Sequence, residues 1–377
     1  MDKYKIILVA GARPNFMKIA PLIQELNANS IIETFLLHTG QHYDEKMSEL
    51  FFKQLNIPKP NINLGVGSES HAIQFSRIIE RFEKVCLDHK PDMVLVVGDV
   101  NSTAACTIVA AKLNITTCHY EAGLRSGDKT MPEEINRRVT DSITDLFFTT
   151  SIDASQNLIN EGVPENKIHM VGNLMIDSLV KYLDLSIKRK NQFNILDGKI
   201  IKLGQDFLTG NYGVATFHRP VNVDSKKTLT NLINIMCEIS KIIKLIFPIH
   251  PRTYKNIKDF GLYNIMRQHK GLFLMEPVGY IEFIRLLENS AFTMTDSGGI
   301  QEEATYLNIP CLTVRRNTER PITLWEGTNK LIEINEIIDN VKNIINGKGK
   351  KGKIPKYWDG NSASRILKHI LQFIKEN

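Results

Sequence analysis

Residues 93–120 read MVLVVGDVNSTAACTIVAAKLNITTCHY and contain the three elements that decide the fold. A short β-branched run at 93–97 is followed by a helical pattern over 102–113 and then by a second β-branched run at 116–120. Two strands joined by a helix pair in parallel, because the helix carries the chain back to the edge of the sheet where the first strand began. The stretch therefore predicts a parallel sheet whose two faces are covered by helices.

The same alternation extends along the chain in both directions. Further runs predicted as strands are 5–10, 34–38, 212–216, 245–247, 272–275, 292–295 and 311–314. Further helical patterns are 14–27, 44–55, 70–89, 132–140 and 362–375. A polar, lysine-rich stretch at 181–204 interrupts the alternation, and 377 residues suffice for about two domains. We therefore expect two α/β domains, each with its ligand at the carboxyl ends of the strands.

Composition excludes several classes of protein. The net charge of +6 is modest, and the most basic stretch, 342–356, is rich in glycine and nearly free of the aromatic residues on which bases stack. The five cysteines are odd in number and widely spaced, as buried thiols of a reducing compartment are. The apolar run at 6–10 is too short for a signal peptide or a membrane span. We expect a cytoplasmic protein that binds neither nucleic acid nor membrane.

Two loops that follow predicted strands have the chemistry of phosphate sites. Residues 11–18, GARPNFMK, place Arg13 and Lys18 beside the start of a helix. Residues 295–303, TDSGGIQEE, combine small side chains with another helix start, where backbone N–H groups are bare. For either loop taken singly, the alternative is a purely structural role, in which the glycines form a turn and a polar residue caps the helix. The two together indicate an anionic ligand.

Two histidines also follow predicted strands. His218 comes after the strand at 212–216, and His250 comes after the strand at 245–247. Each is explained either by a phosphate contact or by a structural hydrogen bond. The glycine-rich run GKGKKG at 347–352 imitates a nucleotide fingerprint, but it follows no strand and lacks the Ser or Thr of a P-loop. Nicotinamide cofactors and ATP are therefore not expected.

Acidic residues gather in the loops of the first half of the chain. Asp99 follows the strand at 93–97, Glu121 follows the strand at 116–120, and Glu133 and Glu134 open the next helix. Asp99 could instead cap a helix, and acids in a first helical turn are stabilising by themselves. Beside the basic loops, however, the acids indicate proton transfer on a substrate that carries a phosphate or diphosphate. No metal-ligand spacing accompanies them, so we expect an acid/base enzyme without metal or cofactor.

Taken in order, these loops resemble the non-hydrolysing UDP-N-acetylglucosamine 2-epimerases. The matching segments are GARPNFMKIAPL at 11–22, TGQH at 39–42, VGDVNST at 97–103, EAGLRSGD at 121–128, PEEINRRVTD at 132–141, GNLMID at 172–177, HRPVN at 218–222, EPVGY at 276–280, TDSGGIQEEA at 295–304 and TERP at 318–321. They cover nearly the whole chain, which makes the series far more specific than any one motif.

The resemblance implies a fold and an activity. The fold is α/β, with two Rossmann-like domains in the glycosyltransferase B arrangement and the active site in the interdomain cleft. We expect the first domain over 1–172, with the helix at 362–377 packing back on it, a UDP-binding domain over 173–361, and a homodimer. The family inverts C2 of UDP-N-acetylglucosamine to give UDP-N-acetylmannosamine, a precursor of cell-surface polysaccharide. It eliminates UDP to form 2-acetamidoglucal and then adds UDP back.

The resemblance also assigns roles to residues. Asp99, Glu121 and Glu133 match the catalytic carboxylates, with the division of proton transfers among them left open. His218 matches the active-site histidine near the diphosphate. The expected substrate- and UDP-binding residues are Arg13, Lys18, Arg137, His250, Tyr280, Phe283, Ser297, Gly298, Gly299, Glu303 and Arg320. Of these, Tyr280 or Phe283 is expected near the uracil, and Arg320 either contacts the ligand or orders its loop.

Departures from the better-known bacterial members keep other substrates open. These departures are Ala12, Asn15, Pro220 and Val221, all beside the expected active site. HTGQHYDEKMS at 38–48 resembles relatives that epimerise UDP-2,3-diacetamido-2,3-dideoxyglucuronic acid. Of two glutamines that bind an activating second substrate in some members, only Gln41 matches, with Asp44 in the other place. The alternatives are the diacetamido-uronic acid epimerase, a hydrolysing epimerase that releases N-acetylmannosamine, and a glycosyltransferase of the same fold.

Overall fold

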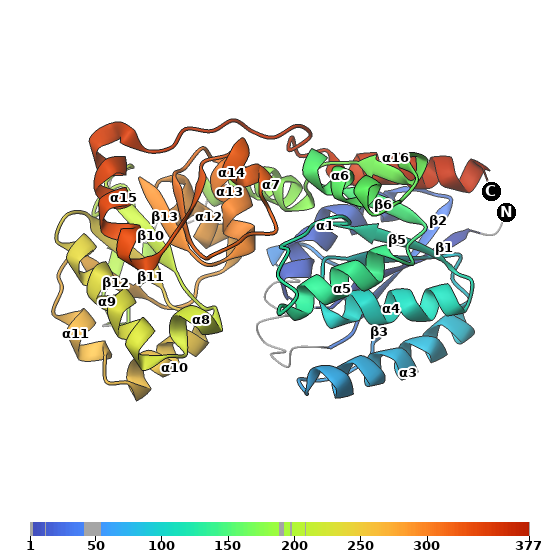
Figure 1. Ribbon diagram of the computed structural model, residues 1–377, viewed down its shortest axis with the longest axis horizontal. Coiled ribbons are helices and arrows are strands. Elements are labelled where there is room, and N and C mark those ends of the chain that lie inside the picture. The colour runs from blue at the N-terminus through green and yellow to red at the C-terminus, as the bar shows by residue number, and fades with distance from the viewer. Residues whose placement is uncertain are drawn as a thin grey trace. The chain divides into compact units, whose positions relative to one another are not determined.

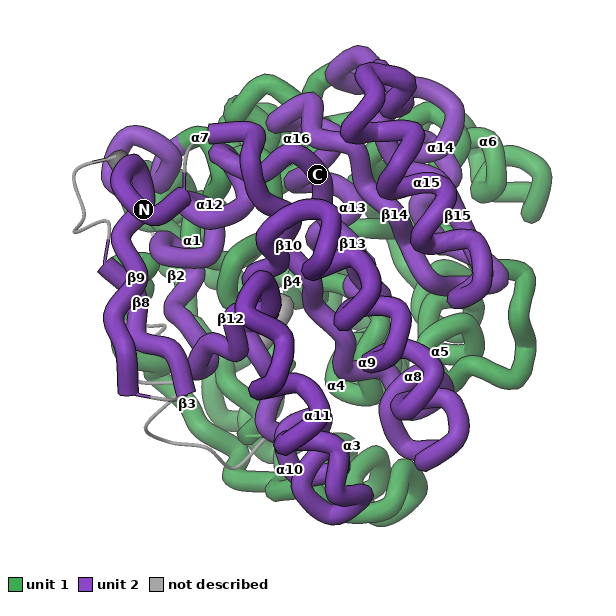
Figure 2. Tube along the Cα trace, turned by 90° about the vertical axis from the view of Figure 1, so that its left-hand side faces the viewer, with its two compact units in different colours: residues 1–180, 356–377 green, residues 181–355 purple. Residues whose placement is uncertain are grey.

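The computed structural model describes residues 3–11, 13–40, 54–187, 192–196, 198–207 and 209–376. The chain forms two compact units: unit 1 is residues 1–180 with 356–377, and unit 2 is residues 181–355 (Figure 2). Unit 1 extends past residue 172, the expected boundary, because the first half of α7 (Leu174–Ile187) buries Leu174, Ile176 and Leu179. The chain returns to unit 1 at 356, before the last helix begins.

Unit 1 is built on a seven-stranded sheet. Its strands are β1 (Tyr4–Ala10), β2 (Ile32–His38), β3 (Ile62–Asn63), β4 (Met93–Val97), β5 (Thr116–Tyr120), β6 (Leu146–Thr149) and β7 (Ile168–Met170). The spatial order is β3-β2-β1-β4-β5-β6-β7, and all neighbours pair in parallel. Every residue of β4 is buried, as expected of an apolar, β-branched strand with helices on both faces.

The helices of unit 1 follow its strands along the chain (Figure 1). They are α1 (Arg13–Ala28), α3 (His71–His89), α4 (Asn101–Lys112), α5 (Pro132–Asp141), α6 (Ile152–Asn160), the 3₁₀ turn Glu165–Lys167, the start of α7, and α16 (Ser362–Glu376). One face of the sheet forms a core with α3 and α4, in which Val94 and Val96 meet Phe82 and Val109. The predicted helix at 44–55 falls largely outside the described residues.

The C-terminal segment is anchored within unit 1. Helix α16 packs against α1. Just before it, the fully buried Trp358 donates its indole N–H to the Thr150 carbonyl oxygen at 3.0 Å. At the start of the helix, the Ala363 N–H donates to Asp177 at 2.8 Å. These contacts place the last helix with the first part of the chain.

Unit 2 contains a six-stranded parallel sheet and a small antiparallel pair. The strands are β8 (Gln192–Asn194), β9 (Ile200–Lys202), β10 (Tyr212–Thr216), β11 (Lys244–Pro248), β12 (Leu272–Met275), β13 (Phe292–Thr295), β14 (Cys311–Val314) and β15 (Asn329–Ile332). The large sheet has the order β12-β11-β10-β13-β14-β15, and β8 pairs with β9. Thus the polar stretch at 181–204, predicted as an interruption, continues α7 and then forms a hairpin.

The helices of unit 2 cover its sheet (Figure 1). They are α8 (Pro220–Val223), α9 (Lys226–Ser240), α10 (Pro251–Asp259), α11 (Tyr263–Arg267), α12 (Tyr280–Glu288), α13 (Gly298–Tyr306), α14 (Ile322–Trp325), α15 (Ile337–Asn343), and the short turns Ile334–Glu336 and Ile344–Lys348. The main core joins Phe247 and Met294 of the sheet to Leu232 and Met236 of α9. Within the ranges that the structure describes, no helix is long and apolar enough to span a bilayer.

Both sheets reverse their strand order at one point, and that point locates the expected ligand sites. In unit 1, β1 lies next to β4, and in unit 2, β10 lies next to β13. Loops leaving two such neighbouring strands run in opposite directions and open a crevice at the carboxyl edge, where ligands of doubly wound sheets bind. The loops in question are those after Ala10 and Val97 in unit 1, and those after Thr216 and Thr295 in unit 2.

Candidate active site

In unit 1, three loops converge on the ion pair between Lys18 and Glu121. The Lys18 Nζ lies 2.5 Å from Glu121 Oε2, and both side chains are buried. Beside this pair, Asn15 donates its amide hydrogen to the Val97 carbonyl oxygen at 2.5 Å. Gly98 has φ of +77°, and a Cβ there would lie 3.3 to 3.5 Å from Asn15, Glu121 and Lys18 polar atoms. The ends of β1, β4 and β5 therefore meet closely enough to require glycine.

Glu121 itself has an unusual backbone. Its φ is +73°, a left-handed conformation that costs about 1 kcal/mol or more for a residue with a Cβ. The conformation is held because Glu121 N–H and Ala122 N–H both donate to the Phe148 carbonyl oxygen of β6, at 3.1 and 3.3 Å. Strain of this kind is concentrated at functional sites. It supports the expected role of Glu121.

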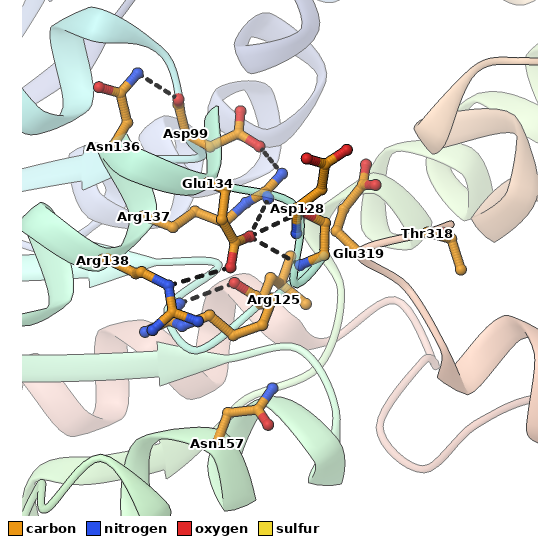
Figure 3. A network of polar contacts seen from close by, with 12 residues as sticks. Asp99, Arg125, Asp128, Glu134, Asn136, Arg137, Arg138, Asn157, Thr318 and Glu319 are labelled. Carbon is orange, nitrogen blue, oxygen red and sulfur yellow. Dashed lines mark hydrogen bonds and ion pairs between the residues drawn. The ribbon is translucent and has the colours of Figure 1, made fainter. Parts of the chain in front are cut away.

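Asp99 belongs to a second polar group, which Figure 3 shows. Arg137 Nη2 lies 2.5 Å from Asp99 Oδ2, and Arg137 Nη1 lies 3.1 Å from Glu134 Oε2. The residue that caps α4 is Val100, so Asp99 is not a helix cap. The Asp99 side chain is 27% exposed, while Arg137 and Glu134 are buried. Of these three side chains, Asp99 is the one that is partly exposed to solvent.

The adjacent residues Glu133 and Glu134 have different environments. Glu134 Oε2 accepts hydrogen bonds from the N–H and hydroxyl of Ser126 at 2.8 and 3.0 Å. Burial opposes ionisation of Glu134, but the bonds from Ser126 and Arg137 bring its pKa below its usual range. Glu133 is half-buried and has no hydrogen bond or ion pair within the described part of the chain. Of the two, Glu133 is the one available to a substrate.

In unit 2, the buried carboxylate of Asp296 holds the loop that carries His218. Asp296 accepts hydrogen bonds from the N–H groups of His218 and Arg219 at 3.0 to 3.1 Å and from the Asn222 amide at 3.0 Å. The His218 Nδ1 also lies 3.1 Å from Asp296, whereas the His218 side chain is 40% exposed. Burial opposes the charge, but His218 and Asn222 lower the pKa of Asp296. Because Nδ1 faces Asp296, Nε2 is the nitrogen available to a phosphate oxygen.

Asp296 was not among the site residues predicted from the sequence, although it lies within the matched segment 295–304. The feature of the sequence that could have revealed Asp296 is its place directly after a predicted strand and before Ser-Gly-Gly. Asn222 gives a similar case, because its amide bridges Asp296 and the Val314 carbonyl oxygen at 3.2 Å. Both residues join loops that are more than 70 positions apart in the chain, so sequence spacing carries no sign of the contact.

The predicted phosphate loop of unit 2 forms the start of α13. Ser297 precedes the helix and has no side-chain capping bond, and Gly298 and Gly299 are the first helical residues. A Cβ on Gly298 would lie 2.9 Å from atoms of both Arg320 and Glu319, so the close approach of these side chains requires glycine. Unpaired N–H groups at a helix start bind anions well.

The Arg320 guanidinium lies in a buried charge network. Its side chain is 9% exposed, its Nε lies 2.9 Å from Glu302 Oε1, and its Nη1 pairs with Glu319. Glu319 in turn pairs with Arg315 at 2.8 Å. This buried network holds the TERP loop against the start of α13, so Arg320 orders the loop.

Glu303 and Tyr280 form a buried acidic pair. Burial raises the pKa of Glu303 to about 8. The Tyr280 hydroxyl lowers this pKa and the charge of Glu302 raises it, but both effects are smaller than that of burial. The Tyr280 ring lies edge-on to Tyr182, with 6.4 Å between centroids. Phe283 packs on the apolar core of the unit.

The remaining expected residues are placed as follows. His250 caps α10, its Nδ1 accepts the Arg252 N–H at 3.2 Å, and its ring lies 5.4 Å from that of His218. Arg13 begins α1, but its side chain lies outside the described part of the structure, as do Ala12, Gln41 and Asp44. In the described ranges, no three His, Cys, Asp or Glu side chains group as a metal ion would require.

Two Rossmann-like units, one with a group of acids and one with phosphate-type loops at its switch point, define an enzyme of nucleotide-linked substrates. The chain belongs to the UDP-N-acetylglucosamine 2-epimerase family, whose model matches residues 24–371. The expected family is thus confirmed, and with it the expected enzyme class, since this is a family of isomerases.

Individual relatives agree with this assignment. The UDP-N-acetylglucosamine 2-epimerase of Methanocaldococcus jannaschii is 41% identical over 368 residues, which cover 97% of this chain and 98% of the relative. The UDP-2,3-diacetamido-2,3-dideoxy-D-glucuronate 2-epimerase of Pseudomonas aeruginosa is 35% identical and covers 97% of this chain and 99% of its own. A crystal structure of the M. jannaschii enzyme with UDP-GlcNAc and UDP matches with a TM-score of 0.86 at 40% identity, covering 98% and 99% of the two chains. The expected fold class is confirmed.

Proposed function

We propose that this protein is a non-hydrolysing 2-epimerase that interconverts UDP-N-acetylglucosamine and UDP-N-acetylmannosamine. The observation that carries the proposal is the set of three acids, Asp99, Glu121 and Glu133, on neighbouring loops at the carboxyl edge of one sheet. Support also comes from the 41% identical M. jannaschii enzyme and from the complex of that enzyme with UDP-GlcNAc and UDP.

The reaction needs proton transfer and a clamp on the leaving group. The C2 proton of the substrate has no adjacent carbonyl, so it leaves only as UDP departs from C1, which gives 2-acetamidoglucal. Protonation of C2 from the other face and return of UDP complete the inversion. The enzyme must therefore supply a base and an acid near C2 and hold UDP throughout.

The two units divide these tasks. In unit 2, His218 and the N–H groups at the start of α13 hold the diphosphate, and Glu303 and Tyr280 hold the nucleoside. In unit 1, Asp99 lies 2.5 Å from Arg137 and Glu121 lies 2.5 Å from Lys18, and these two carboxylates serve the proton transfers at the sugar.

Proton NMR of the purified protein with UDP-N-acetylglucosamine in heavy water tests the proposal. We expect UDP-N-acetylmannosamine to appear with deuterium at C2. Turnover without solvent deuterium at C2 contradicts elimination and re-addition. Release of free N-acetylmannosamine and UDP identifies a hydrolysing enzyme instead, and sugar transfer to an acceptor without C2 exchange identifies a glycosyltransferase.

A second substrate has a specific observation in its favour. The P. aeruginosa relative at 35% identity is an epimerase of UDP-2,3-diacetamido-2,3-dideoxy-D-glucuronate. The chemistry at C2 is the same, and only the groups at C3 and C6 differ. Competition between the two UDP-sugars at equal concentration decides between them, since the preferred substrate has the higher kcat/KM.

Two further expectations belong to the same proposal. We infer a homodimer, which the family resemblance supports and which analytical ultracentrifugation tests through the mass of the particle. We also infer a cytoplasmic location. The five cysteines support it, because all are free and buried, as in a reducing compartment. Cell fractionation with an antibody against the chain tests that location.

A further inference from the structure

A buried chain of charged side chains in unit 1 contacts the loops that carry the acids. His119 is fully buried in β5. Its Nδ1 lies 2.6 Å from Asp141 Oδ1, and its Nε2 lies 2.8 Å from the Gly98 carbonyl oxygen. The second oxygen of Asp141 accepts the Gly123 N–H at 3.0 Å and pairs with Arg125 at 2.7 Å. None of these four side-chain contacts has a part in the proposed proton transfers.

Two acceptors hold the His119 ring. The Gly98 carbonyl oxygen only accepts, so Nε2 faces it as a donor. Burial opposes the charge of Asp141, but His119 and Arg125 bring its pKa below its usual range, so this carboxylate is an acceptor as well. His119 therefore joins Gly98 to Asp141 through its two ring nitrogens.

The His119 side chain connects the three segments that carry the candidate acids. Gly98 precedes Asp99, and its N–H is held by the Tyr120 carbonyl oxygen at 3.0 Å while its C=O is held by His119. Glu121 lies two residues after His119 on the same segment. Asp141 is the last residue of α5, whose first turn carries Glu133. Removing His119 would leave the Gly98 carbonyl and Asp141 without the contact that joins them.

We propose that His119 is a positioning residue for the epimerisation. By donating to Gly98 and Asp141 at once, it fixes the separations among Asp99, Glu121 and Glu133. The inference rests on the proposed function, because the distance between base and acid matters only for transfer at one carbon. A displacement of about 1 Å can lower a rate about a hundredfold.

Two substitutions of His119 separate its two contacts. In His119→Gln, the amide nitrogen lies as far from the backbone as Nε2 and can still donate to Gly98. In His119→Asn, the amide nitrogen lies only as far as Nδ1 and can donate to Asp141 alone. Both variants replace the imidazole by a neutral amide, so they are matched in that respect. Cys118→Ala, on the opposite face of β5, is the control for destabilisation of the same buried strand.

The experiment compares kcat of the two variants with each other, and likewise their KM values. We expect kcat in His119→Asn to fall about a hundredfold, kcat in His119→Gln to fall about tenfold or less, and KM to change little in either. Cys118→Ala, with a similar loss of thermal stability, should keep kcat near that of the wild type. Equal kcat in the two His119 variants, or a fall that tracks stability across all three variants, overturns the inference.

A second measurement does not depend on activity. Hydrogen–deuterium exchange of the segment 98–101 should be faster in His119→Asn than in His119→Gln, because only the asparagine frees the Gly98 carbonyl. If the wild type shows no exchange at substrate C2, the proposed function fails, while the difference between the two variants still decides the positioning of this segment. Identical exchange in both variants overturns the positioning role.

Discussion

Replacing the buried Glu303 by glutamine should make the protein more stable at neutral pH and weaken its binding of UDP. The pKa of Glu303 is about 8 in the folded chain against an ordinary value of 4.5, chiefly because burial opposes its charge. The folded state therefore keeps a proton that the unfolded state gives up. Glutamine has nearly the same shape, stays neutral at every pH, and can keep the contact with Tyr280.

The pKa difference sets the sign and size of the effect. Below pH 4.5 both states hold the proton, and Glu303 adds no pH dependence. As pH rises from 4.5 to 8, the unfolded state ionises first, so the free energy of unfolding falls. At pH 7 the loss is about 3 kcal/mol, taking about 1.4 kcal/mol for each pH unit above 4.5. The glutamine variant does not have this loss.

Urea denaturation followed by circular dichroism between pH 5 and pH 8 checks the stability. The wild type should lose stability over this range, while Glu303→Gln should give a flatter curve and lie above the wild type at pH 7. Glu276→Gln, at an exposed position of the same unit, is the control and should follow the wild type. Parallel curves for wild type and Glu303→Gln would refute the reasoning from burial.

Calorimetric titration with UDP checks the other half of the prediction. We expect UDP to bind Glu303→Gln about tenfold more weakly, because the amide cannot replace the carboxyl group in both donating and accepting at the same atom, and one lost hydrogen bond is worth about 1 kcal/mol. A gain in stability with a loss of affinity is the pattern of a group kept for function. Unchanged UDP affinity would remove Glu303 from the nucleoside site.

Three further predictions concern the other acids of the site. Asp99→Asn and Glu121→Gln should each lower kcat by about a hundredfold or more with an unchanged circular dichroism spectrum, which is the usual effect of losing an acid or base. Near-normal rates in both variants would show that the chemistry lies elsewhere. Glu133→Gln should lower kcat without lowering the melting temperature, whereas Glu134→Gln should lower the melting temperature by several degrees, because it weakens a buried ion pair. Scanning calorimetry distinguishes these two variants, and the reverse pattern would exchange the roles of Glu133 and Glu134. Asp296→Asn should weaken UDP binding about tenfold, because an amide places a donor against the N–H groups that Asp296 accepts; equal affinity in calorimetry would contradict the role of Asp296 in holding its loop.

Much of the fold followed from local pattern. The strands at 93–97, 116–120, 212–216, 272–275 and 292–295 have the bounds predicted for them, because apolar β-branched runs between turns are typical of buried parallel strands. The strands β6, β7 and β15 and the β8–β9 hairpin were not predicted. All are three or four residues long, so they have too little periodicity to stand out from loops.

For the candidate site, too, one part could be predicted from the sequence and another could not. Each expected loop follows a strand end, and parallel strands bring their carboxyl ends to one edge, so order along the chain was enough to group them. The roles within each loop needed contacts. Glu133 and Glu134 are neighbours of one residue type, and only the buried bonds from Ser126 and Arg137 distinguish them. The pairs of Arg320 with Glu302 and Glu319 likewise appeared only in the structure.

By itself, then, the sequence determined which acidic and basic loops follow the strand ends, because residue type, spacing and strand ends are local properties. Only the tertiary structure decided which side chains pair. Lys18 meets Glu121 across 103 positions, and Arg137 meets Asp99 across 38. The left-handed backbone of Glu121 likewise depends on the Phe148 carbonyl of the neighbouring strand. Such contacts are set by strand order and register, which bring distant residues together through the packing of the whole sheet.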